Sequence, residues 1–107
     1  MVEAQAAPDV TLEEFNHYAD AMKEYAKTKE FGNLNKDQKL QVYSLGKQGQ
    51  EGDNTTAKPG MLAIKEKYKW EAWNKLKGMD QQLAKNQFVA LAKTYVPKQW
   101  DLSIYWW

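Results

Sequence analysis

The sequence predicts an all-α fold, and within that class a four-helix bundle. Apolar side chains recur at the three- and four-residue spacing of a helix in four separate segments of the 107-residue chain. No stretch alternates apolar and polar residues over the length of a useful strand. Hydrophobic residues make up 43% of the chain, which is enough to build the core of one domain.

The first two helices are predicted from their starting signals and their apolar stripes. The first begins after Thr11, which forms a capping-box pattern with Glu14, and it runs for about four turns. The second covers about residues 35–48. A polar loop rich in glycine, asparagine and threonine then follows from Gly49 to Gly60, and it is long enough to cross from one end of a bundle to the other.

The last two helices are bounded by glycine, aspartate and proline. The third is predicted over residues 62–77, with Gly78 after its end. The fourth begins after Asp80 as the N-cap and continues through Tyr95, because Pro97 cannot continue a helix. We therefore expect a flexible leader over residues 1–10, a helical domain over residues 11–97 and a separate tail over residues 98–107.

The tail and the leader carry further expectations. Three of the five tryptophans lie in the tail, so we expect it to be ordered or self-associating rather than free in solvent. The leader has no basic region and no hydrophobic stretch, unlike a secretory signal. The longest apolar run, residues 88–92, is far shorter than the roughly 20 residues that span a bilayer. A cytoplasmic protein is expected.

The residue inventory disfavours several function classes. Cysteine is absent and His17 is the single histidine, which excludes thiol chemistry, disulfides and multi-histidine metal sites. Ser44 and Ser103 are the only serines, so a Ser-His-Asp triad has almost nothing to be built from. All 15 basic residues are lysine, so the chain cannot make the arginine–guanine contacts that are common in sequence-specific DNA recognition. We expect no catalytic residue, no metal, no cofactor and no nucleic-acid partner.

Lysine and tyrosine spacing indicates an anionic ligand. Residues 58–98 contain nine lysines and three acidic residues, so this part of the chain is strongly basic. Tyr43 and Lys47 lie four residues apart on the second helix, and Lys65 and Lys69 lie four apart on the third. If these helices approach each other, a ring and three ammonium groups converge. Such a cluster suits a ligand with an aromatic base and several phosphates.

Four short blocks carry a family resemblance: VYSLGKQ at residues 42–48, GDNT at 52–55, KPGML at 58–62 and KWEAWNKLKG at 69–78. Together they resemble the acyl-CoA-binding protein family, whose pattern reads YxxYKQAxxGDxNxxxPGMxxxxxxAKWxAWxxxKG. The resemblance covers about residues 12–95. It implies an up-down-down-up bundle that carries long-chain acyl-CoA in fatty-acid metabolism and is not a catalyst.

The resemblance also implies a ligand site. In the family the CoA head group lies across the outside of the bundle, and the acyl chain is buried beneath it. The residues that match the family's head-group contacts are Tyr43, Lys47, Lys65, Lys69 and Lys23. Leu40 would line the acyl channel.

Three positions depart from the family pattern. Gly46 replaces the second aromatic residue of the second helix, Phe88 replaces a tyrosine of the fourth, and Tyr68 stands where the pattern has alanine. We hypothesise that the adenine contact has moved to Tyr68, with Phe88 as the opposing apolar wall. The alternative is that Tyr68 is an ordinary exposed tyrosine and that the site is weaker.

Other interpretations remain open at the level of sequence. The main alternative is a scaffold that docks to a protein or membrane through its aromatic tail. An acyl-CoA hydrolase is disfavoured because His17 is isolated in the sequence and no cysteine is present. As partners we expect long-chain acyl-CoA and transient contacts with membranes or with enzymes that use acyl-CoA. We expect a monomer, with a dimer through the tail as the alternative, and Trp70 and Trp73 in the core.

Overall fold

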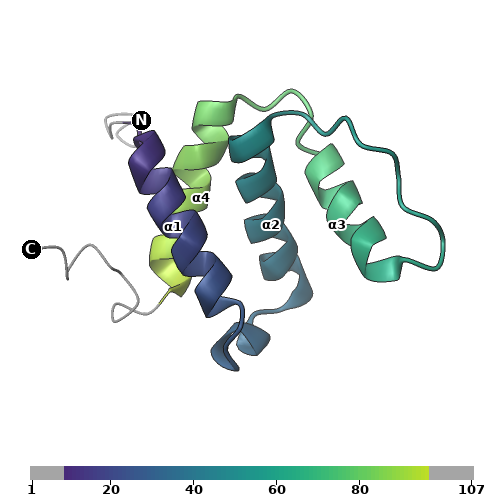
Figure 1. Ribbon diagram of the computed structural model, residues 1–107, viewed down its shortest axis with the longest axis horizontal. Coiled ribbons are helices and arrows are strands. Elements are labelled where there is room, and N and C mark those ends of the chain that lie inside the picture. Colours follow the sequence, from purple (N-terminus) through teal and green to yellow (C-terminus); the bar gives the residue numbers. More distant parts are fainter. Residues whose placement is uncertain (1–8, 97–107) are drawn as a thin grey trace, which may run out of the picture.

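The computed structural model describes residues 9–96, and within them it contains four α-helices, one short 3₁₀ helix and no strand (Figure 1). The elements are α1 (Leu12–Tyr25), η2 (Glu30–Asn33), α2 (Lys36–Glu51), α3 (Ile64–Asn74) and α4 (Gln81–Tyr95). Helices α2 and α3 run in one direction and α1 and α4 in the other, with a long crossing loop between α2 and α3. The predicted all-α class and up-down-down-up order are confirmed.

Side-chain caps set three of the helix starts. The Thr11 hydroxyl accepts a hydrogen bond from the Glu14 backbone N–H at 3.0 Å, and the Glu14 carboxylate accepts one from the Thr11 N–H at 3.0 Å. Asn35 forms the same reciprocal box at the start of α2. Asp80 accepts from the Leu83 N–H at 3.0 Å. These caps satisfy backbone donors that have no partner within the helix.

Two helix ends differ from the prediction. Helix α2 continues to Glu51 rather than ending near residue 48, so Gly49 is buried inside it. A Cβ atom on Gly49 would lie 3.1 Å from Cε1 of Phe15 and 3.3 Å from the backbone N of Lys85, so close packing, rather than a turn, requires this glycine. Helix α3 is shorter than the predicted 62–77, because turns occupy both of its ends.

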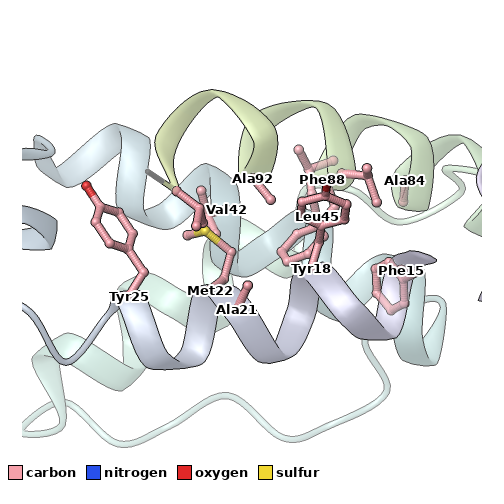
Figure 2. Packing of buried hydrophobic residues seen from close by; sticks show 12 residues of the cluster. Phe15, Tyr18, Ala21, Met22, Tyr25, Val42, Leu45, Ala84, Phe88 and Ala92 are labelled. Atoms are coloured by element: carbon pink, nitrogen blue, oxygen red, sulfur yellow. The ribbon is translucent and has the colours of Figure 1, made fainter. Parts of the chain in front are cut away.

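The hydrophobic core lies between α1, α2 and α4, as Figure 2 shows. Within it, Phe15 and Phe88 meet edge to face, with ring centres 5.3 Å apart. Helix α3 contributes a single buried side chain, Trp73. The expectation that Trp70 would share the core is wrong. Trp70 is only half-buried, and its indole N–H donates to the Thr56 carbonyl at 3.0 Å.

A small polar network joins the two loops that flank α3. The Gln48 side chain is fully buried, and its amide nitrogen donates to Asp53 at 2.9 Å and to the Met79 carbonyl at 2.8 Å. Asp53 also accepts from the Gly78 N–H at 2.8 Å. The Gly78 and Gln48 hydrogen bonds lower the pKa of Asp53, since both favour the charged carboxylate. Through these bonds the loops hold α3 beside α2.

The two described residues ahead of the first cap are attached to α4. The Val10 N–H donates to the Asn86 side chain at 2.9 Å, and Gln82 donates to the Val10 carbonyl at 2.9 Å. Asn86 also donates to Asp9 at 3.0 Å. Residues 1–8 of the predicted leader and the whole predicted tail, 98–107, lie outside the described residues. Among residues 9–96, no helix has the length and apolar character needed to cross a membrane.

Candidate functional site

A pocket of about 1230 Å³ opens between α1, η2, α2 and α3, and one side chain of α4 reaches its floor. All the residues proposed from sequence lie in its wall. They are Lys23, Leu40, Tyr43, Lys47, Lys65, Tyr68, Lys69 and Phe88. The helical spacing and the approach of α2 to α3 thus bring these side chains together around one space.

The wall of the pocket combines positive charge with an apolar surface. Its lysines are Lys23, Lys36, Lys39, Lys47, Lys65 and Lys69. Its large apolar side chains are Phe15, Met22, Phe31, Leu40, Val42, Ile64 and Phe88. Among the described residues that line the pocket, none is acidic. Such a wall suits a ligand that combines several negative charges with a hydrocarbon portion.

The predicted tyrosine–lysine cluster is formed across α2 and α3. The Lys69 ammonium lies 4.7 Å from the centre of the Tyr43 ring, within the range of a cation–π contact. Lys47 lies 4.9 Å from the centre of the Trp73 ring, which places its charge between the same two helices. Each lysine also pairs with a glutamate on its own helix, Lys47 with Glu51 and Lys69 with Glu66.

Two further lysines line the pocket and were missed from sequence. The Lys36 ammonium sits 3.3 Å from the centre of the Tyr68 ring, and Lys39 lies 5.3 Å from that of Phe31. Lys36 and Lys39 precede Tyr43 by seven and four residues, so they fall on the same helical face. Extending the Tyr43 stripe toward the start of α2 would have found them.

The space beside Gly46 is occupied by Phe88. A Cβ atom on Gly46 would lie 3.1 Å from Cε1 of the Phe88 ring, which is closer than ordinary packing allows. Phe88 is 4% exposed and packs on Phe15, so it forms part of the pocket floor. Tyr68, by contrast, is 43% exposed at the rim. The missing ring at Gly46 therefore leaves no hole, because the ring of α4 fills it.

No cluster of three or more histidine, cysteine, aspartate or glutamate side chains suited to a metal ion occurs within residues 9–96. His17 packs edge to face on Tyr18, with ring centres 4.8 Å apart. It is not among the residues that line the pocket.

The bundle and its lysine-rimmed pocket define a helical ligand-binding protein, and sequence comparison gives its family. The family model described as "Acyl CoA binding protein" matches residues 12–92. The chain belongs to the acyl-CoA-binding protein family.

Individual relatives and solved structures agree with this assignment. The chain is 42% identical over 86 residues to an acyl-CoA-binding protein homolog of Drosophila melanogaster, a match covering 80% of this chain and 94% of that one. It is 44% identical over 62 residues to the acyl-CoA-binding protein of Saccharomyces cerevisiae, covering 58% of this chain and 71% of the relative.

Two solved structures share the fold. Oryza sativa acyl-CoA-binding protein 2 superposes with a TM-score of 0.66 at 31% identity, over 78% of this chain and 87% of that one. An ACBP structure from Moniliophthora perniciosa gives a TM-score of 0.73 at 20% identity, over 92% and 95% of the two chains. The second likeness concerns the fold alone.

Proposed function

We propose that this protein binds long-chain acyl-CoA esters and carries them as a cytoplasmic pool, without catalysing a reaction on them. The observation that carries the proposal is the lining of the pocket, which combines six lysines with seven large apolar side chains. Acyl-CoA has the matching chemistry: a head group with several phosphates and a base, joined to a hydrocarbon chain. The relatives' names and the family assignment support the same ligand.

In the proposed complex the two parts of the ligand meet different walls. Lys47 and Lys69 contact the phosphates of the head group, with Lys23, Lys36 and Lys65 adding positive charge around them. Leu40 and its apolar neighbours cover the acyl chain, at roughly 0.8 kcal/mol for each CH₂ removed from water. The binding energy thus comes from both ends of the ligand, as a carrier of an amphiphile requires.

The side chains of the wall favour binding over hydrolysis. Cleaving a thioester requires a positioned nucleophile or general base. The described lining residues include no histidine, serine, threonine or carboxylate, and their polar groups are those of lysine, tyrosine and Gln50. These groups suit the recognition of phosphate and base.

The test compares palmitoyl-CoA with its 3′-dephospho form by isothermal titration calorimetry. A charge-assisted hydrogen bond contributes about 1.5–3 kcal/mol, so we expect the dephospho form to bind at least tenfold more weakly. Equal affinities would mean that no lysine of the pocket contacts the 3′-phosphate. Native mass spectrometry of the protein from its source organism would separate a carrier, which co-purifies with acyl-CoA, from a scaffold, which co-purifies with a protein.

Tyr68 is proposed to stack on the adenine base from the rim of the pocket. Tyr68 is 43% exposed, and the Lys36 ammonium lies 3.3 Å from the centre of its ring. Tyr68→Ala should therefore weaken palmitoyl-CoA binding about fivefold, equivalent to about 1 kcal/mol, whereas Tyr68→Phe should retain the affinity. Unchanged affinity in Tyr68→Ala would mean that this ring is an ordinary surface residue.

A further inference from the structure

Exposed apolar side chains gather around the start of α3. Six large hydrophobic residues are exposed within residues 9–96, and four of them lie between residues 61 and 68. Met61 is 84% exposed and Leu62 is 97% exposed, followed by Ile64 at 62%. We call Met61 and Leu62 the apolar tip. Contiguous exposed apolar side chains of this kind usually mark a contact surface.

The backbone presents the apolar tip in a turn. The Ala63 N–H donates to the Gly60 carbonyl at 3.1 Å, which places Met61 and Leu62 at the two central positions. Those positions are commonly taken by proline, glycine, asparagine or aspartate. Neither Met61 nor Leu62 lines the pocket, and neither belongs to the core. The fold and the pocket therefore leave both side chains without a role.

Lysines flank the apolar tip in the sequence. Residues 54–70 contain four lysines and one acidic residue, Glu66. Lys58 pairs with Glu71 at 3.4 Å, but neither Lys65 nor Lys67 makes an ion pair within residues 9–96. Figure 1 shows this turn at the edge of the molecule, far from α1 and α4 and at the end where both α2 and α3 begin.

We propose that the apolar tip inserts into an anionic lipid surface, with Lys58, Lys65 and Lys67 against the headgroups. Exposed apolar side chains suit the hydrocarbon region of such a surface, and the positive side chains beside them suit its anionic headgroups. A protein partner fits less well, because lysine is depleted from protein interfaces and two protruding side chains fall far short of the roughly 1,000 Å² that a specific interface requires.

Because the turn lies beside the pocket, docking through the apolar tip would bring the pocket close to the bilayer. Ile64 and Lys65, which follow the apolar tip after Ala63, line the pocket. A docked molecule would thus hold the rim of its pocket against the bilayer, where a long-chain amphiphile dissolves. Only that consequence rests on the proposed function, since docking of the ligand-free protein does not require it.

The test measures binding of the full chain, without ligand, to phosphatidylcholine vesicles with and without phosphatidylserine. We expect binding to the phosphatidylserine vesicles that falls with salt, and about tenfold weaker binding for the double variant Met61→Ser, Leu62→Ser. The matched control is Leu12→Ser, Leu83→Ser, which removes two exposed leucines from α1 and α4 and should bind like the unmodified protein. Lys67→Gln should lower binding about fivefold.

The outcomes separate this proposal from its competitors. Vesicle binding that survives in Met61→Ser, Leu62→Ser would place the membrane contact elsewhere and overturn the proposal. So would failure of the unmodified protein to bind phosphatidylserine vesicles, or self-association in sedimentation that the double variant abolishes. Palmitoyl-CoA affinity in solution should be the same in the double variant and the control pair. A loss of that affinity would show that the tip belongs to the ligand site.

Discussion

Replacing Trp73 with alanine is expected to lower the free energy of unfolding by about 3–5 kcal/mol. Trp73 is 4% exposed and is the one buried side chain that α3 contributes. Its indole N–H donates to the Gly52 carbonyl at 2.9 Å, and Lys47 lies over its ring. The substitution would leave a large cavity between α2 and α3. Urea unfolding followed by circular dichroism measures the loss.

The same substitution should weaken acyl-CoA binding, because α3 carries Lys65 and Lys69. Two controls define the cause. Trp73→Phe retains a ring and loses one hydrogen bond, so it should cost about 1 kcal/mol of stability. Trp70→Ala removes the half-buried neighbour and should cost clearly less than Trp73→Ala. If the two alanine variants proved equally unstable, α3 would not be anchored through Trp73.

The starts of the helices could be predicted from sequence because a cap is a local interaction. Thr11 and Asp80 each accept a hydrogen bond from the backbone N–H three residues later in the chain. The sequence pattern of the cap and the contact that it predicts therefore lie within one helical turn. The end of α2 could not be predicted in this way. Gly49 and Gly52 look alike in sequence, yet Gly49 packs beneath Phe15 inside the helix, while Gly52 ends it with a φ of 83°. Only the packed structure distinguishes these two roles.

In the candidate site, too, contacts within one helix could be predicted from sequence, and contacts between helices could not be predicted from local spacing. Tyr43 and Lys47 are placed together by helical spacing, so the sequence predicts their shared face. The closeness of Lys69 to Tyr43 depends on how α3 lies against α2, and the family resemblance supplied that expectation. The contact between Phe88 and Gly46 joins α2 to α4, and no local pattern records which ring fills the space above a glycine.

The second large effect is expected on affinity rather than on stability. Lys47→Ala and Lys69→Ala should each weaken palmitoyl-CoA binding about 10- to 100-fold, because each removes a charge-assisted contact to a phosphate in the proposed complex. The melting temperature should change little. The lysine side chains are 29% and 31% exposed, and their ion pairs with Glu51 and Glu66 lie at the surface, where such pairs contribute about 0–1 kcal/mol.

Lys27 provides the matched control for this pair. It makes an ion pair with Glu24 three residues away, the same spacing as Lys69 and Glu66, but its side chain is 72% exposed and lies outside the pocket. Lys27→Ala removes one positive charge from the protein without touching the site. Its palmitoyl-CoA affinity should match that of the unmodified protein. If Lys47→Ala and Lys69→Ala also matched it, net charge and not the placed lysines would account for binding.

The double variant then asks whether the two lysines act on one phosphate group. Lys47 lies on α2 and Lys69 on the facing helix α3. The Lys47 ammonium lies over the Trp73 ring, and the Lys69 ammonium lies over the Tyr43 ring. If both contact the same phosphate, the loss in the double variant should be smaller than the sum of the single losses. If each contacts a different phosphate, the losses should add. Repeating the cycle with 3′-dephospho-palmitoyl-CoA identifies the lysine that serves the 3′-phosphate, because that residue's substitution should no longer change affinity.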